Sequence, residues 1–142
     1  MITTTKSVLI HAPIAKIHEV VLDFEHYPRF FPEVRSIEVL KQTNKSAEVC
    51  FGIHLIKTIN CILKFDIHPK KITWSLVKGD FMKENKGSWE FESKDGKATE
   101  VTYCIEVKPS AWIPSSLIEK HMTSLVPVML KHLKTRCEHT KH

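Results

Sequence analysis

The stretch Asp23-Phe-Glu-His-Tyr-Pro-Arg-Phe-Phe-Pro-Glu-Val34 lies between two patterned parts of the chain, and it is unusually apolar for a connector. Proline fixes its own φ and disfavours the α conformation of the preceding residue, so the prolines predict a stiff corner with extended residues before them. Such a corner can hold Tyr27, Phe30 and Phe31 at the mouth of a cavity. The same aromatic residues also suit a plug that closes a solid core, and both interpretations fit the sequence.

The period of the apolar residues changes across this corner. Before it, residues 4–11 alternate as a strand does, and residues 13–22 carry apolar side chains every three or four positions, which predicts a short helix. After it, alternation with a period of two predicts further strands at 34–41, 47–55, 58–68, around Ile72–Leu76, around Trp89–Phe91, and at 98–108. Asp95-Gly96 predicts a tight hairpin before the last of them.

The segment from about 114 to 138 predicts a long amphipathic helix. Its apolar stripe should consist of Ile118, Met122, Leu125, Met129 and Leu133, flanked by Leu117, His121 and Val128, while Lys120, Ser124, Lys131 and Lys134 face solvent. About seven antiparallel strands with one apolar face need a cover, and this helix supplies it. The expected fold class is therefore α+β, with the sheet wrapped around the last helix.

Bulk composition points to one domain over residues 1–142, with 42% hydrophobic and 26% charged residues. No window approaches the roughly 20 apolar residues of a membrane-spanning helix, and the first residues lack the apolar run of a signal peptide, so we expect a cytoplasmic protein. Cys50, Cys61, Cys104 and Cys137 form no Cys-x-x-Cys motif, and we expect free, mostly buried thiols.

The formal net charge is +5, and part of the excess lies near the end of the chain in Lys131, Lys134, Arg136 and Lys141. Helical spacing and the absence of interleaved aromatic residues favour a solvated helix face. Anionic lipid headgroups, on the inner face of a membrane, and ribosomal RNA remain alternative partners for these charges.

Two separate segments resemble one family. The element order resembles the helix-grip fold of the START/Bet v 1-like (SRPBCC) superfamily, which includes polyketide cyclases. Within it, Phe24-Glu-His-Tyr-Pro-Arg-Phe-Phe-Pro32 is similar to the Tyr-Pro-x-Phe-x-Pro signature of the coenzyme Q-binding branch. Lys78-Gly-Asp-Phe-Met-Lys-Glu-Asn-Lys-Gly-Ser-Trp-Glu-Phe91 is similar to its Gly-Pro-Phe…Gly-x-Trp-x-Phe segment, with Asp80 in place of proline. The resemblance implies that an apolar small molecule is enclosed between sheet and helix.

The residues expected to contact this ligand lie in the corner, on the apolar rows of the strands and on the last helix. They are Tyr27, Phe30, Phe31, Pro32, Phe51, Phe65, Trp74, Phe81, Trp89, Phe91, Tyr103, His121, Leu125 and Met129. The segment Tyr27–Pro32, with Gly79–Met82 opposite, is expected to form the entrance. His121 is the polar candidate, because a neutral imidazole can hydrogen-bond a carbonyl or hydroxyl group, although a boundary histidine satisfied by water fits its position too.

Catalytic and metal signatures are missing from the sequence. The glutamates of the predicted strands fall on the polar face, no carboxylate pair is placed for acid/base chemistry, and no His/Cys spacing suits a metal. We therefore assign no catalytic residue, no metal and no cofactor.

The predicted function is binding of a hydrophobic small molecule, an isoprenoid quinone or lipid, by a carrier or chaperone that does not transform it. One alternative is a ribosome-associating, toxin-like interaction protein. The other is a polyketide cyclase, aromatase or dehydrase, which requires His121 or Tyr103 to face the cavity.

Overall fold

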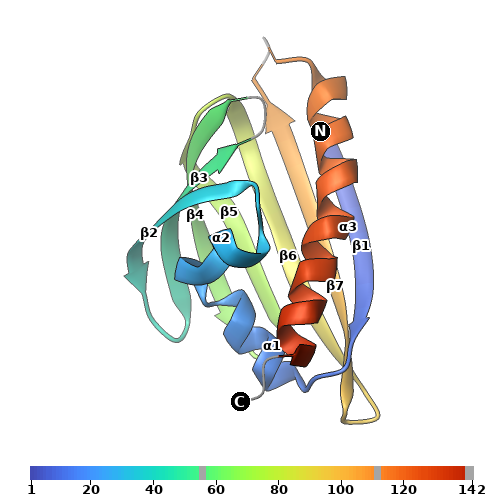
Figure 1. Ribbon diagram of the computed structural model, residues 1–142. Helices are drawn as coiled ribbons and strands as arrows, with labels where there is room; N and C mark the ends of the chain where they lie inside the picture. Colours follow the sequence, from blue (N-terminus) through green and yellow to red (C-terminus); the bar gives the residue numbers. More distant parts are fainter. Residues whose placement is uncertain (55–56, 111–112, 140–142) are drawn as a thin grey trace.

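A seven-stranded antiparallel sheet curls around one long helix, as the sequence predicted (Figure 1). The computed structural model describes residues 1–54, 57–110 and 113–139. The strands are β1 (Ile2–Ile10), β2 (Val34–Gln42), β3 (Ser46–His54), β4 (Thr58–His68), β5 (Lys71–Gly79), β6 (Met82–Lys94) and β7 (Ala98–Pro109). The helices are α1 (Ile14–Val21), the 3-10 turn η1 (Phe24–His26), α2 (Tyr27–Phe30) and α3 (Ser115–His139).

Strands β2 to β7 form a meander, and β1 joins the sheet beside β7, giving the order β1-β7-β6-β5-β4-β3-β2. Residues that pair directly across an antiparallel ladder point to the same face. The pairs Phe51 with Cys61, Phe65 with Trp74, and Trp89 with Tyr103 therefore build one continuous apolar face. Helix α3 lies along this face beside β1, while α1 and α2 fill the space between α3 and β2 (Figure 1).

The predicted hairpin after β6 is confirmed. Asp95 and Gly96 have φ values of 50° and 76°, both in the left-handed region. The strands pair up to Lys94 and Ala98, so the loop is residues 95–97. Its first two residues take the left-handed conformation that aspartate and glycine tolerate better than most residues.

The aromatic corner is helical where we expected it to be extended. Tyr27 precedes Pro28 yet has φ −52° and ψ −40°, so the prediction of an extended residue is wrong there. It is right at Phe31, before Pro32, where φ is −120° and ψ is 89°. Pro28 lies in the first turn of α2, where its missing N–H costs no intrahelical bond. The buried Tyr27 ring and its hydroxyl, which donates to the Val21 carbonyl, hold the helical conformation.

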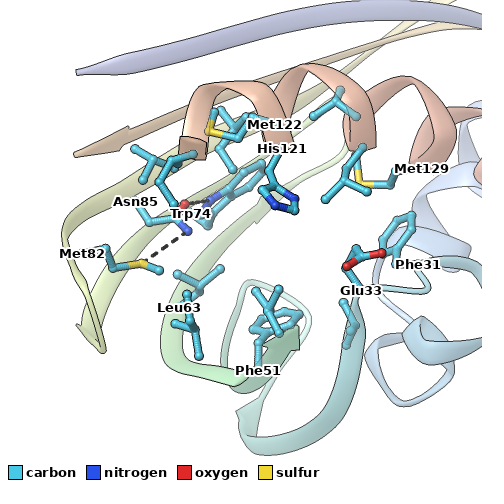
Figure 2. A pocket seen from close by; sticks show the side chains of 18 of the residues that line it. Phe31, Glu33, Phe51, Leu63, Trp74, Met82, Asn85, His121, Met122 and Met129 are labelled. Atoms are coloured by element: carbon cyan, nitrogen blue, oxygen red, sulfur yellow. Dashed lines mark hydrogen bonds between the residues drawn. The ribbon is translucent and has the colours of Figure 1, made fainter. Parts of the chain in front are cut away.

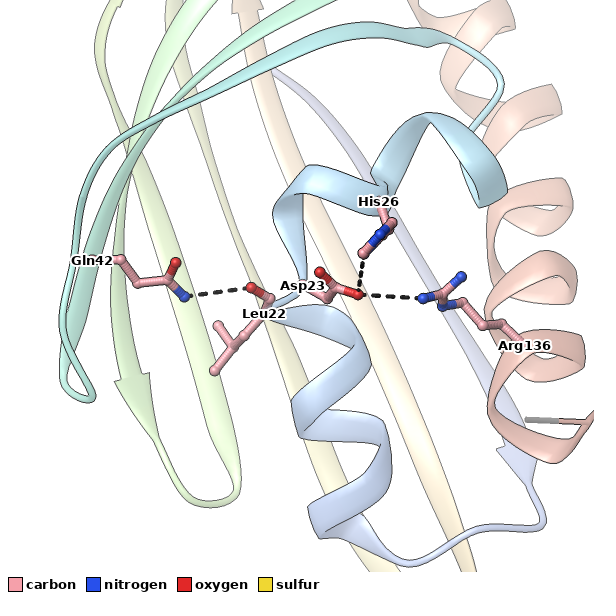
Figure 3. A network of polar contacts seen from close by, with 5 residues as sticks. All are labelled: Leu22, Asp23, His26, Gln42 and Arg136. Atoms are coloured by element: carbon pink, nitrogen blue, oxygen red, sulfur yellow. Dashed lines mark hydrogen bonds and ion pairs between the residues drawn. The ribbon is translucent and has the colours of Figure 1, made fainter. Parts of the chain in front are cut away.

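Polar contacts tie this corner to both sides of the molecule (Figure 3). The Asp23 Oδ2 atom accepts from His26 Nδ1 at 2.7 Å and from Arg136 Nη2 of α3 at 3.3 Å. On the other side, Gln42 Nε2 of β2 donates to the Leu22 carbonyl at 3.4 Å. The corner is therefore held between β2 and the C-terminal half of α3.

Helix α3 buries only part of the predicted stripe. Ile118 and Leu133 are buried as predicted, and the other buried residues are Val126, Leu130 and Cys137. Met122, Leu125 and Met129 are only half-buried, because they stand over a space rather than on the sheet. Lys134, predicted to face solvent, is also half-buried, and its Nζ atom donates to the Leu9 carbonyl of β1 at 2.6 Å.

Candidate functional site

A cavity of about 250 Å³ separates the sheet from the N-terminal half of α3 (Figure 2). Its lining comes from the corner, from strands β2 to β7 and from α3, and it is almost wholly apolar. The alternating residues of the strands place every second side chain on this face, which is why so many separate segments contribute to one space.

The floor of the cavity is a connected set of rings. Trp74 stacks on Tyr103 with ring centroids 5.4 Å apart, and it also contacts Phe65 at 6.0 Å. The Trp89 ring also packs against Tyr103, with ring centroids 4.6 Å apart. Ring contacts of this kind fix side chains by mutual packing, so the floor is rigid. The roof, formed by Met122, Leu125 and Met129 of α3, consists of flexible unbranched or γ-branched chains.

The two sides predicted to form the entrance differ in burial. Tyr27 and Phe31 are 5% and 6% exposed and pack against each other at 4.7 Å, so they belong as much to the core as to a rim. Pro32 is exposed and lines the cavity. Tyr27 and Phe31 are therefore part of the core and part of the cavity lining at the same time. The corner combines the two roles that the sequence left open, a plug of the core and a wall of the cavity.

On the other side, Phe81 has φ 59°, which is unusual for a residue with a large side chain. Backbone bonds hold it there: the Ser110 N–H donates to the Phe81 carbonyl at 3.0 Å, and the Asp80 N–H donates to the Asn60 carbonyl at 3.0 Å. Asp80 Oδ2 also accepts from the Asn60 N–H at 3.1 Å. These two bonds of Asp80 hold the turn that presents Phe81 to the cavity. The Lys57 Nζ atom lies 4.0 Å from the centre of the Phe81 ring.

Two polar residues of the lining were missed by the sequence analysis. Asn85 of β6 accepts a hydrogen bond on Oδ1 from Trp74 Nε1 at 3.0 Å. Glu33 is the other, at the end of the aromatic corner (Figure 2). The sequence predicted a strand only around Trp89–Phe91, whereas β6 begins at Met82. Extending the Trp89 row backwards by two and four positions leads to Gly87 and Asn85, and this period-two signal was available in the sequence.

Glycine at position 87 allows the Trp74 indole to lie across β6. A Cβ atom there would come within 2.3 Å of the Trp74 ring and 2.3 Å of the Cys104 carbonyl oxygen. Any side chain would therefore push the indole out of the floor. The Gly-x-Trp-x-Phe spacing thus has a packing reason in this protein.

The two tyrosine hydroxyls of the lining, those of Tyr27 and Tyr103, keep their protons at neutral pH. Burial raises the pKa of Tyr27 well above its usual value, with smaller contributions from Tyr103 and Asp23. Burial also raises the pKa of Tyr103, with a smaller contribution from Cys104. Both hydroxyls can donate a hydrogen bond, but neither is suited to act as a base. In residues 1–54, 57–110 and 113–139, Glu33 is the one carboxylate of the lining, so a carboxylate pair is absent there.

Most of the predicted contact residues meet in this cavity. The lining includes Tyr27, Phe31, Pro32, Phe51, Phe65, Trp74, Phe81, Trp89, Tyr103, His121, Leu125 and Met129. Phe91 does not belong to it, because its ring is buried in the core, 6.0 Å from the His18 ring. The Phe30 side chain lies outside the described part of the structure. Contact of these residues with a ligand stays a prediction.

The basic side chains at the C-terminal end of α3 are less available to an anionic partner than the sequence suggests. Arg136 pairs with Asp23, and Lys134 bonds to β1 and to Glu138, which leaves Lys131 as the exposed cation of the described cluster. Lys141 lies outside the described residues. No described helix is long and apolar enough to cross a membrane. Nor do three or more histidine, cysteine or acidic side chains converge on a metal-binding position within the described ranges.

Comparison with known proteins supports the fold. Residues 10–134 match the family described as polyketide cyclase/dehydrase and lipid transport. No curated protein sequence matches the chain.

Among solved structures, a START superfamily protein from Mycobacterium smegmatis has a TM-score of 0.83 at 20% identity, covering 96% of this chain and 97% of its own. The Zhui aromatase/cyclase from Streptomyces sp. R1128 has a TM-score of 0.86 at 15% identity, covering 96% and 93%. A STAR-related lipid transfer protein from Xanthomonas axonopodis has a TM-score of 0.80 at 18% identity, covering 95% and 85%. At these identities the likeness shows a shared helix-grip fold.

Proposed function

This chain belongs to the polyketide cyclase/dehydrase and lipid transport family, and from that premise we propose that it binds one compact hydrophobic molecule, an isoprenoid quinone or lipid, and carries or shields it unchanged. The observation that supports this most is the apolar cavity of about 250 Å³ under α3. Burial of apolar ligand surface supplies the driving force.

The cavity volume limits what can be enclosed. An apolar cavity of about 150 Å³ is enough to hold benzene, so 250 Å³ suits roughly a bicyclic ring system. A quinone ring fits this description, and a long isoprenoid tail would have to remain outside. Binding of the ring alone is the form of the proposal that the volume favours.

Contact with an anionic membrane is part of this proposal. Leu117 and Val128 are exposed apolar residues of α3, Val128 also lines the cavity, and Lys131 is exposed on the same helix. Apolar side chains next to a cation suit the surface of an anionic bilayer. Such contact would bring the cavity to the source of a lipid or quinone.

The test is mass spectrometry of organic extracts from the natively purified protein. Wild type should carry a hydrophobic molecule in stoichiometric amount, and Leu125→Trp should lose it, because the larger indole would occupy the cavity. Thr123→Trp is the matched control on the same helix, at an exposed position outside the cavity lining, and should stay loaded. An empty wild type that also takes up no added 1,4-naphthoquinone would overturn the proposal. A charged residue in place of Phe31 would test ligand binding less cleanly, because that ring is buried in the core and its loss would also affect the fold.

A second candidate function is cyclase or dehydrase chemistry on a polyketide-like substrate. Such an enzyme would need His121 or Tyr103 at the substrate, and both line the cavity. In that case His121→Leu or Tyr103→Phe would abolish turnover of an added polyketide analogue while leaving its affinity within about twofold. Equal turnover in wild type and in both variants would remove this candidate.

A further inference from the structure

The amide of Asn85 is a buried polar group in an apolar cavity. It is 6% exposed, belongs to β6 and pairs across the sheet with Val107 of β7. Buried polar groups are rarely retained without a hydrogen-bonding partner, so the partners of this amide show what it can do.

The orientation of the amide is fixed by Trp74. An indole N–H can only donate, so the atom 3.0 Å from Trp74 Nε1 must be the oxygen of the Asn85 amide, and the nitrogen must point elsewhere. The indole in turn is held by stacking on Tyr103 at 5.4 Å and by the room that Gly87 leaves for it. Asn85 is therefore oriented before any ligand arrives.

The amide nitrogen is left with weak partners. Its one hydrogen bond within the described residues is to Met82 Sδ at 3.8 Å, and a thioether is a poor acceptor (Figure 2). An amide nitrogen carries two N–H groups, so at least one strong donor remains to be satisfied beside the cavity. A ligand with an acceptor oxygen gains a hydrogen bond there, and a hydrocarbon does not.

The charges of the lining decide which oxygen compounds are suitable. Glu33 contributes a carboxylate, and no lysine or arginine belongs to the lining in the described ranges. An anionic ligand such as a free fatty acid would meet a like charge without a compensating cation. A neutral carbonyl compound avoids this conflict.

We propose that Asn85 Nδ2, oriented by Trp74, is a hydrogen-bond donor that makes the cavity selective for neutral carbonyl compounds of about bicyclic size over hydrocarbons and carboxylates. This inference rests on the proposed binding function and specifies its ligand class. His121, on the roof, is not required for this selection.

The test compares α-tetralone with tetralin, which share one bicyclic frame and differ by a carbonyl oxygen. Isothermal titration calorimetry should give a tetralone-to-tetralin affinity ratio that falls about five- to tenfold in Asn85→Leu. Trp74→Phe, which releases the amide from its fixed orientation, should lower the ratio by a smaller factor. His121→Leu tests the competing polar group of the lining, and it should leave the ratio within about twofold if Asn85 provides the selection.

Asn85→Leu also removes the acceptor for the Trp74 indole, so a second variant is needed that keeps this bond. Asn85→Asp keeps that acceptor and offers no donor once its carboxyl is ionised, so at a pH where it is ionised it should lose tetralone affinity even if the leucine variant cannot be purified. The carboxylate arm uses 1-tetralincarboxylate, which should bind wild type at least about tenfold more weakly than tetralone and improve in Glu33→Gln.

The outcomes separate the two proposals. If both neutral probes bind and their ratio is unchanged in the Asn85 variants, or falls only in His121→Leu, the Asn85 inference is overturned and the binding function stands. If tetralincarboxylate binds as tightly as tetralone, the selection for neutral ligands is overturned. If wild type binds none of the probes, the proposed binding function fails together with the inference.

Discussion

The two halves of α3 cover the same sheet but meet it in different ways. In the C-terminal half, Leu130, Leu133 and Cys137 are buried against the sheet and α1. In the N-terminal half, Met122 and Leu125 are half-buried over the cavity. The exposed Pro127 lies between the two halves.

Polar contacts follow the same division. Glu138 Oε2 accepts from the His11 N–H at 2.8 Å and from Lys134 Nζ at 2.7 Å, and Arg136 reaches Asp23. In the N-terminal half, Ile118 packs in a small separate cluster with Ile2 and Val107, and Val126 at the end of this half belongs to the main core. The comparison indicates that the C-terminal half holds the fold together, while the N-terminal half encloses the space for a ligand.

The largest expected effect is on packing. Leu133 is 0% exposed, and Leu133→Ala should lower the free energy of unfolding by about 2–5 kcal/mol, because a fully packed site leaves a new cavity. Leu125→Ala should lower it by less than about 1.5 kcal/mol, since that side chain already borders a cavity. Urea denaturation measures both. Equal losses would mean that the two halves contribute alike to stability.

The next effect tests the floor of the cavity. Gly87→Ala should lower the free energy of unfolding by about 1–3 kcal/mol, because the new methyl group would collide with a backbone carbonyl and with the Trp74 ring. Gly52→Ala is the control, in which the close atom is the Ser36 hydroxyl, the end of a side chain that can rotate away. Near-ultraviolet circular dichroism should show a changed tryptophan signal in the Gly87 variant alone. The same signal change in both variants would contradict this account.

A smaller effect is expected at the link between the corner and α3. Asp23→Ala removes the acceptor of His26 and Arg136, and because these groups are partly exposed the loss should be only about 0.5–1 kcal/mol. Glu25→Ala removes the same charge from an exposed neighbouring position and should cost less than about 0.5 kcal/mol. Chemical denaturation at low and high salt should show the difference shrinking as salt rises. A salt-independent difference would exclude an electrostatic origin.

The smallest effect concerns pH. Burial by itself raises the pKa of Glu138, but the bonds from the His11 N–H and from Lys134 outweigh it, so the pKa lies below 4.5. The folded state then binds this proton less readily than the unfolded state, so the contribution is present above pH 4.5 and is lost as the pH falls through the folded-state pKa. The stability difference between wild type and Glu138→Gln should accordingly shrink in acid. Urea midpoints across this range measure it, and a constant difference would contradict the assignment.

Local patterns were enough to predict most of the fold. The helix-grip order, the seven strands and the hairpin at Asp95-Gly96 follow from periodicity and turn chemistry, which depend on neighbours in sequence. The helical corner did not follow, because the burial of Tyr27 and its bond to Val21 override the usual preference of a residue before proline.

Local periodicity indicates which side chains of a strand or helix can face inward, because a period of two or of 3.6 assigns residues to faces. Whether the inward space is filled depends on how helix and sheet pack in three dimensions. The roof residues Met122 and Leu125 do not reach the floor, because the helix and the sheet are separated by the cavity at this point. The donor role of Asn85 likewise arises from a partner eleven residues away, Trp74, and from the room left by Gly87. Such distances and partners are set by packing across the whole molecule, and no local pattern encodes them.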